Sequence, residues 1–425
     1  MALVRRTAWL QVVEGAACAA RFPVRAEGRR NHFLPKRGLF GVVLGACLVT
    51  ACWAAPSLPS DGSVVLERLR ERPFDTASRE LRALRQSLAR DPTNLALATR
   101  VAQRYIEEAR QQGDPRFVGY AQAAIGPWWS LPRPPNAVLV LRATIRQSSH
   151  DFDAALADLA QVVKSEPGNA QAWLTRATIL QVKGDYGEAA QSCQQLSRLA
   201  PAYITASCLA GVASMTGQAE AGYQLLLRTL EKNPAASDAE RVWVETGLAE
   251  IATRLDRRVA AEGHFTRALR INASDPYLKG AYADFLLDAG RAREVVRLLS
   301  ADARIDGLLL RLALAEQAMG AAELPGRTAS LRARFDAARA RGDRVHQREE
   351  ARFQTYLLKQ PREGLKLAQS NWVVQKEPAD ARVLLEAALA ADEPKAAQPV
   401  IDWMNRNNVE DAALARIAQR LRRPG

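Results

Sequence analysis

The sequence predicts an all-α fold in which antiparallel helix pairs stack into a solenoid, and two observations support this prediction. First, the middle of the chain repeats with a period of about 34 residues, so that residues 136–169 align with residues 170–203. Residues of the same kind recur at the same places of both units: Ala143 and Ala177, Phe152 and Tyr186, Ala155 and Ala189, Pro167 and Pro201. Second, apolar residues within each unit follow the three- and four-residue spacing of amphipathic helices.

The unit at residues 170–203 shows why each of its halves should form a helix. Trp173 and Ala177 lie four positions apart and therefore on one helical face. Gly184 permits the positive φ angle that ends a helix, and Pro201 ends the second helix because proline cannot continue the backbone hydrogen bonds. One such hairpin cannot bury its apolar face alone, so neighbouring pairs must stack on each other.

The residues Trp173, Ala177, Tyr186, Ala189 and Pro201 resemble the pattern of the tetratricopeptide repeat, which has Trp, a small residue, Tyr, Ala and Pro at these places. The resemblance implies a right-handed superhelical solenoid whose concave face binds polypeptide, and it implies a binding surface in place of an active site. An ordinary helical bundle with an alanine-rich core is the alternative fold.

The same reading predicts the other helices along the chain. A single helix is expected at residues 75–90 and a terminal capping helix at residues 412–421. Helix pairs are expected at 95–112 with 115–125, 204–215 with 219–231, 239–255 with 258–271, 276–287 with 292–300, 305–320 with 325–341, 345–359 with 362–375, and 379–391 with 394–406. The Trp- and Pro-rich stretch 127–135 is expected to be extended.

These elements divide the chain into four parts. Residues 1–56 form an N-terminal extension and leader, and residues 57–135 hold the first helices with the Trp/Pro-rich loop. The regular repeat array spans residues 136–303, and degenerate repeats with the capping helix span residues 304–425.

The leader resembles a secretory signal. Lys36 and Arg37 precede the uncharged residues 39–51, a run that is too short to span a bilayer. Cys52 ends a sequence that resembles a lipoprotein box, which would make it an acylated membrane anchor; cleavage before Ala55 would instead release a soluble protein. Either product is a periplasmic or envelope protein. A buried helix is the alternative reading, and residues before Leu34 are interpreted as an extension upstream of the true translation start.

The positive charge of the chain does not predict nucleic-acid binding. The formal net charge is +13, but residues 1–56 contain eight basic and two acidic residues. The remaining arginines scatter over the expected outer helix faces, apart from Arg332–Arg348 and Arg420–Arg423, and solvation explains both groups; contact with anionic lipid headgroups or a polyanion is the alternative. We therefore expect a protein partner and no nucleic acid.

No motif for catalysis or for a metal, cofactor or small-molecule substrate stands out. The four histidines, His32, His150, His264 and His346, are dispersed along the chain. Neither a glycine-rich phosphate-binding loop nor a Gly-x-Ser-x-Gly nucleophile turn occurs. His264 beside Phe265 on an apolar helical face is interpreted as a packing residue.

The family resemblance implies which residues would bind a peptide. The groove of this family is lined by the first helix of each unit, which places these residues there: Ala137, Val140, Thr144, Gln147, Gln171, Leu174, Thr178 and Gln181. A surface role with docking elsewhere, for instance on Trp128 and Trp129, is the alternative. The lysines and asparagines of the eukaryotic chaperone-tail clamp do not occur at these places.

Two cysteines in neighbouring helices form a candidate disulfide. Cys193 lies before Pro201 on a second helix, and Cys208 follows it on the next first helix, so both are expected at a similar height. An exported protein would meet oxidising conditions that favour the bond. A buried free thiol at Cys193 is the alternative.

The sequence thus predicts a non-catalytic scaffold of the bacterial cell envelope that binds a peptide or protein on the concave face. The first alternative is a cytoplasmic regulatory or nucleic-acid-associated helical-repeat protein. A second is an accessory unit for a glycosyltransferase, which would need a catalytic domain from another chain.

Overall fold

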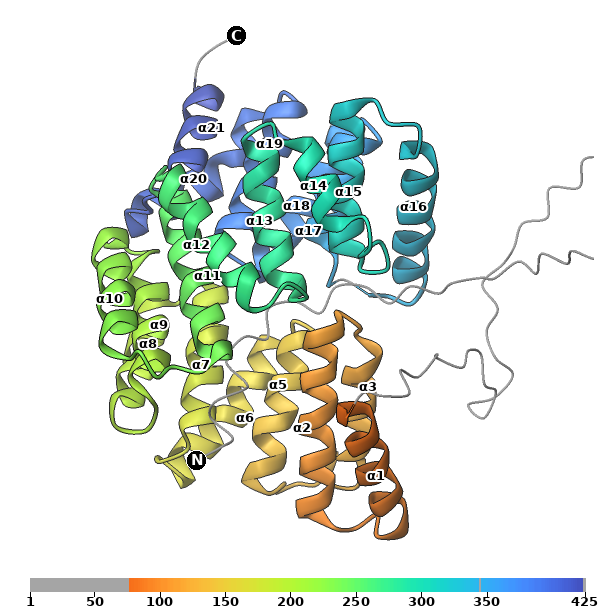
Figure 1. Ribbon diagram of the computed structural model, residues 1–425, viewed down its shortest axis with the longest axis vertical. Helices are drawn as coiled ribbons and strands as arrows, with labels where there is room; N and C mark the ends of the chain where they lie inside the picture. The colour runs from red at the N-terminus through yellow and green to blue at the C-terminus, as the bar shows by residue number, and fades with distance from the viewer. Residues whose placement is uncertain (1–75, 344, 423–425) are drawn as a thin grey trace, which may run out of the picture. The chain divides into compact units, whose positions relative to one another are not determined.

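The computed structural model describes residues 76–343 and 345–422, which belong to one compact unit and are drawn as coloured ribbon in Figure 1. These residues form α-helices and short helical turns, without a strand among them, and the predicted all-α fold of stacked helix pairs is confirmed. The leader, including Cys52, lies outside the described residues.

The first half of the described chain contains the longest regular run of helix pairs. Its helices are α1 (Thr76–Arg90), α2 (Leu95–Gln112), α3 (Arg116–Ala124), α4 (Gly126–Trp129), α5 (Asn136–Ser148), α6 (Phe152–Ser165), α7 (Ala170–Lys183), α8 (Tyr186–Gln195), α9 (Ala202–Ala213), α10 (Ala219–Lys232), α11 (Asp238–Arg254) and α12 (Arg258–Ile271). A 3₁₀ turn at Leu196–Arg198 extends α8.

The second half continues the pattern with more irregular elements. Its helices are α13 (Pro276–Asp288), α14 (Ala292–Leu299), α15 (Asp306–Met319), α16 (Leu324–Ala340), α17 (Gln347–Arg352), α18 (Pro361–Val374), α19 (Pro378–Ala390), α20 (Gln398–Asn407) and α21 (Ala412–Arg422). A π-helical turn at Phe353–Leu357 follows α17, and a 3₁₀ turn at Pro394–Ala397 precedes α20.

Local sequence signals explain where the helices begin and end. The Asn169 side chain accepts a hydrogen bond from the Ala172 N–H and so caps the start of α7. At the end of the same helix, Gly184 adopts the left-handed conformation with φ at 84°, which a side chain would strain. The small residues Ala177 and Ala189 are fully buried and allow α7 and α8 to pack closely.

The Trp- and Pro-rich stretch differs from its prediction. The expected extended conformation is wrong for Pro127–Trp129, which belong to the short helix α4 (Gly126–Trp129). Pro127 fits the first turn of this helix, because the N–H that proline lacks would have no partner there. Trp128 and Trp129 are half-buried against the apolar cluster formed by α1–α5. The Trp129 carbonyl also accepts a hydrogen bond from the Arg142 guanidinium.

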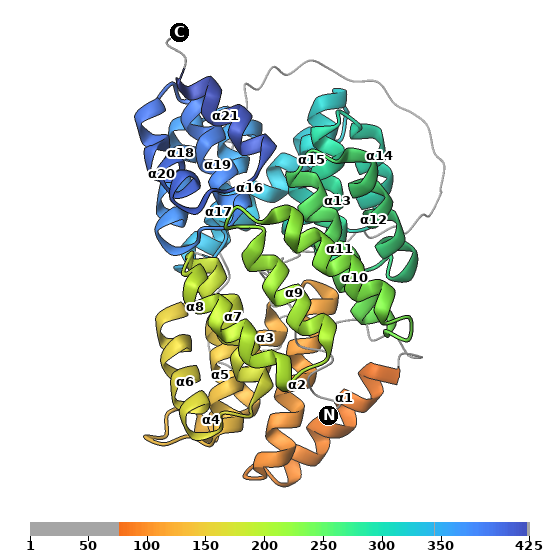
Figure 2. The ribbon, with the colours of Figure 1, turned by 90° about the vertical axis from the view of Figure 1, so that its left-hand side faces the viewer.

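Helices from the end of the chain contact the central repeats, as well as their own neighbours. The Lys376 N–H donates a hydrogen bond to the Val182 carbonyl oxygen at 2.7 Å, and the Lys376 ammonium donates to the Lys183 carbonyl oxygen at 3.1 Å. Glu410 accepts a hydrogen bond of 2.6 Å from the Ala219 N–H at the start of α10. Figure 2 shows the C-terminal helices, in blue, next to α8.

Candidate peptide-binding cavity

The first helices of successive repeats line one cavity of about 370 Å³, which we name the central cavity. Residues of α7, α9, α11, α13 and α15 contribute most of its wall. The remaining wall comes from α2, from Tyr186 of α8, Leu226 of α10 and Arg348 of α17, and from the start of α19 with the connection before it, where Lys376 and Glu377 lie. The central cavity therefore occupies the place at which a repeat solenoid presents its concave face.

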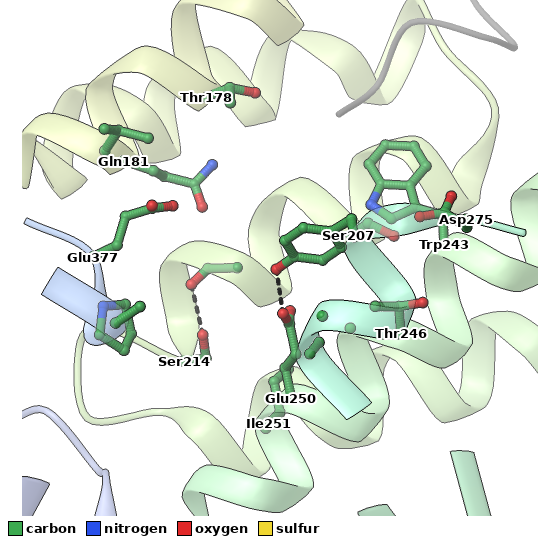
Figure 3. Close-up of a pocket in the computed structure, with 18 of the residues that line it drawn as sticks. Thr178, Gln181, Ser207, Ser214, Trp243, Thr246, Glu250, Ile251, Asp275 and Glu377 are labelled. Atoms are coloured by element: carbon green, nitrogen blue, oxygen red, sulfur yellow. Dashed lines mark hydrogen bonds between the residues drawn. The ribbon is translucent and has the colours of Figure 1, made fainter. Parts of the chain in front are cut away.

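The wall of the central cavity combines an apolar surface with polar groups that can form hydrogen bonds. Its apolar side chains are Leu174, Val182, Met215, Leu226, Val242, Ile251 and Leu308. Thr178, Gln181, Ser207, Ser214 and Thr246 supply hydroxyl and amide groups. In the view of Figure 3, Thr178 and Gln181 lie on one side of the cavity, and Trp243 and Asp275 lie on the opposite side.

Two carboxylates in the wall, Glu250 and Asp284, have pKa values that are shifted in opposite directions. Glu250 accepts a hydrogen bond from the Tyr277 hydroxyl, and burial raises the pKa of Glu250 above its usual value. Burial would also raise the pKa of Asp284, but the guanidinium groups of Arg311 and Arg352 outweigh this effect and hold the pKa well below its usual range. Asp284 accepts hydrogen bonds of 2.7 Å from Arg311 and 3.0 Å from Arg352.

Of the eight groove residues that the sequence predicts, three line the central cavity and five do not. Leu174, Thr178 and Gln181 line the central cavity. Gln171 is half-buried and donates a hydrogen bond to Thr175 at 3.0 Å, away from the cavity wall. None of the four residues from α5 is among the wall residues: Ala137 is exposed, and Val140, Thr144 and Gln147 are buried. Val140 is buried in the apolar cluster that α5 forms with α6 and α7.

Sequence reasoning missed the part of the wall that comes from α11 and α13. Trp243, Thr246, Glu250 and Tyr277 all lie on first helices of repeats. Leu174 was predicted from its place on the first helix of a unit. The same places on α11 and α13 would have indicated residues on the same helical face. The contribution of Lys376 had no such signal, because it arises from a contact between distant repeats.

Cys193 and Cys208 lie at disulfide distance and join α8 to α9. Their sulfur atoms are 2.00 Å apart and their Cα atoms are 5.5 Å apart. Cys193 is fully buried, and Cys208 contributes to the wall of the central cavity. The bond therefore ties together two consecutive repeats at the wall.

His264 is a buried structural residue, as its place on an apolar helical face suggested. His264 is 3% exposed, and its Nε2 lies 2.9 Å from the Tyr223 hydroxyl oxygen. Its Nδ1 lies 2.5 Å from a carboxylate oxygen of Glu245, which also accepts a hydrogen bond from Arg267. None of these four residues lines the central cavity.

Residues 76–343 and 345–422 contain neither a cluster of metal-ligating side chains nor a membrane-spanning helix. Groups of three or more His, Cys, Asp or Glu side chains that could hold a metal ion are not found there. Within the same residues, none of the helices combines the length and the apolar character needed to cross a membrane.

Comparisons with known proteins give distant structural similarity. No protein-family profile and no curated protein sequence matches the chain. The crystal structure of the APC/C hetero-tetramer Cut9–Hcn1 is similar at a TM-score of 0.46 and 11% identity, over 82% of this chain and 67% of that one. Yeast Tom70 is similar at a TM-score of 0.36 and 10% identity, over 81% of this chain and 85% of that one.

A tetratricopeptide repeat protein from Parabacteroides merdae is similar at a TM-score of 0.35 and 15% identity, over 59% of this chain and 98% of that one. Since all three TM-scores lie below 0.5, the assignment depends on the helix pairs of this chain and on their period of about 34 residues. On those grounds the chain is an all-α helical-repeat protein, and its repeat resembles the tetratricopeptide pattern.

Proposed function

We propose that this protein is a non-catalytic scaffold that binds an extended segment of a protein partner in the central cavity. The observation that carries the proposal is the convergence of five first helices, α7, α9, α11, α13 and α15, on one partly apolar cavity. Hydroxyl and amide groups beside an apolar surface suit a peptide, whose backbone needs hydrogen bonds and whose side chains need apolar contacts.

The leader supports a location in the bacterial cell envelope. An uncharged run after Lys36 and Arg37 is typical of an export signal, and the pair of cysteines at disulfide distance suits an oxidising compartment. Cell fractionation tests this part of the proposal. Recovery of the protein in the cytoplasm with residues 37–55 still attached would contradict it.

A photocrosslinking experiment tests the binding site. A benzoylphenylalanine residue at Thr178 faces the central cavity, whereas the same residue at Gln194 lies on the exposed face of α8. We expect a protein adduct in cells from the first position and not from the second. The captured partner is then purified and titrated against the full mature protein.

A cavity-filling substitution separates specific binding from adventitious capture. Thr178→Trp fills part of the cavity without replacing a fully buried side chain, and Gln194→Trp adds the same side chain outside it. We expect the first variant to weaken binding of the purified partner at least tenfold and the second to leave it unchanged. Equal affinity for both variants would exclude the central cavity as the binding site.

A further inference from the structure

Three consecutive helix pairs, from α7 to α12, touch the C-terminal helices at the turn inside each pair. We name this row of contacts the seam, and it consists of Gly184, Gly217, Ala219 and Asp256 on one side and of Lys376, Asn408, Glu410 and Arg416 on the other. A Cβ atom added to Gly184 would lie 3.6 Å from the Cβ of Lys376. A Cβ atom added to Gly217, between α9 and α10, would lie 2.9 Å from the Cβ of Asn408.

Most of the seam consists of isolated polar contacts. Arg416 donates a hydrogen bond of 3.3 Å to Asp256, and both side chains are exposed, so that this pair contributes little. Glu410 accepts a hydrogen bond of 2.6 Å from the Ala219 N–H. Trp403 adds one buried aromatic side chain beside the turn between α7 and α8. The seam is therefore held together more weakly than the two helices of one repeat, which pack along their length.

The seam closes one side of the central cavity. Lys376, together with Glu377 and Ala379 that follow it, belongs to the cavity wall. The cavity volume of about 370 Å³ lies near the lower end of the range of about 300–1,000 Å³ that holds a drug-sized molecule. An extended segment of twelve residues, by contrast, reaches about 40 Å. The closed cavity thus accommodates only a short part of such a segment, and a longer part needs the wall to move.

We propose that the seam is a gate, which opens to admit the partner segment and closes the central cavity in its absence. This inference rests on the proposed function. Opening leaves each helix pair intact, because the seam joins different repeats and not the two helices of one repeat. The free energy needed to break the seam lowers the apparent affinity for the segment, because only the open fraction of the molecules can bind it.

A disulfide across the seam tests the gate. The double variant Gly184→Cys with Lys376→Cys places its Cβ atoms 3.6 Å apart, within the range of about 3.5–4.5 Å found in disulfides. The probe is a fluorescein-labelled dodecapeptide, enriched from a random library displayed on phage by the full mature protein and not bound by Thr178→Trp. We expect oxidation of the double variant to weaken binding of this peptide at least tenfold, and reduction to restore it.

The single variant Gly184→Cys is the control for this experiment. It carries the same strain at a left-handed backbone position, with φ at 84°, and it also retains Cys193 and Cys208. Its affinity for the peptide should be the same with and without the reducing agent. Peptide mapping by mass spectrometry identifies which cysteines are bonded, and circular dichroism verifies that both variants fold.

A weakened seam should have the opposite effect. Glu410→Ala removes the contact with the Ala219 N–H, and Glu410 does not line the cavity. We expect this variant to bind the dodecapeptide about fivefold more tightly, the factor that corresponds to about 1 kcal/mol of lost seam contact. Glu231→Ala, at an exposed position of α10 outside the seam, should leave the affinity unchanged.

The outcomes separate this inference from the proposed function. Two results would overturn the gate and leave the proposed function standing. In one, the oxidised double variant binds the dodecapeptide as tightly as its reduced form; in the other, Glu410→Ala binds it no more tightly than Glu231→Ala. A library selection that yields no peptide excluded by Thr178→Trp would contradict the proposed function, and the gate would fail with it.

Discussion

The backbone N–H of Lys376 donates a hydrogen bond to the carbonyl oxygen of Val182, at the end of α7, over a distance of 2.7 Å. The Tyr186 hydroxyl, at the start of α8, donates to the Lys376 carbonyl oxygen at 3.4 Å. One residue from the connection between α18 and α19 thus contacts both helices of a repeat that lies far away in sequence. This contact brings Lys376 into the wall of the central cavity.

Glu410 should stabilise the start of α10 from a distance. It accepts a hydrogen bond from the Ala219 N–H, and the helix has no side-chain cap of its own. We expect Glu410→Ala to lower the free energy of unfolding by about 1 kcal/mol, the usual effect of losing a helix cap. Hydrogen exchange should speed up at the Ala219 amide. Glu231→Ala, at an exposed position near the end of the same helix, is the control, and equal exchange in both variants would exclude the cap.

The bond between Cys193 and Cys208 should contribute to stability. It closes a segment with a sequence separation of 15, for which chain entropy predicts a stabilisation of about 3 kcal/mol. Replacing both cysteines by Ala should lower the urea midpoint accordingly, and a reducing agent should then have no further effect. Titration of the denatured, unreduced protein is the direct check, because two free thiols would rule out the bond.

Asp158 should be essential to the first regular repeat. It accepts hydrogen bonds of 2.7 and 2.8 Å from Arg142, which is itself buried, and a third from Arg146. We expect Asp158→Asn to lower the free energy of unfolding by about 3 kcal/mol, because it leaves the Arg142 charge buried without compensation. The control is Asp153→Asn, since the Asp153 side chain is 88% exposed and its ion pair with Lys183 should contribute little.

His150 should make stability depend on pH. Burial, followed by the positive charge of Arg348, lowers its pKa to about 4; Glu349 and Asp343 raise it, and His346 lowers it further. Because an unfolded histidine has a pKa near 6.5, the unfolded chain binds more protons between these values. The contribution is therefore complete above pH 6.5 and is lost as the pH falls toward 4, by roughly 3 kcal/mol at most.

His150→Asn tests this pH dependence. Asparagine tolerates the positive φ of 57° that His150 adopts, so the turn between α5 and α6 should persist. Urea unfolding at several pH values between 4 and 7.5 should show a smaller loss of stability in this variant than in the unmodified protein. Parallel curves for the two proteins would exclude His150 as the titrating group.

The helices could be predicted from the sequence because their signals are local. The spacing of Trp173 and Ala177, the left-handed Gly184 and the helix-ending Pro201 each act within a single unit, and the boundaries expected from such signals agree with the structure to within two residues for α7 and α9. The π-helical turn at Phe353–Leu357 carries no comparable signal, so the stretch around it was expected to be an ordinary helix.

The candidate site could be predicted only in part, because it depends on which repeats face each other. Leu174, Thr178 and Gln181 followed from their places in one unit. Val140 and Thr144 hold the equivalent places in the preceding unit, but both are buried, Val140 in the apolar cluster of α5, α6 and α7. Contacts such as that of Lys376 involve single polar groups in an irregular connection, and a period of about 34 residues contains no information about them.

The contact between Lys376 and Val182 also constrains how this chain can change in evolution. In a repeat array whose units touch only their neighbours, whole units can be duplicated or deleted while the others keep their places. Here an added or lost unit between α8 and α18 would shift the connection that follows α18 away from α7. The contact between Lys376 and Val182 therefore limits how many units can lie between these two helices.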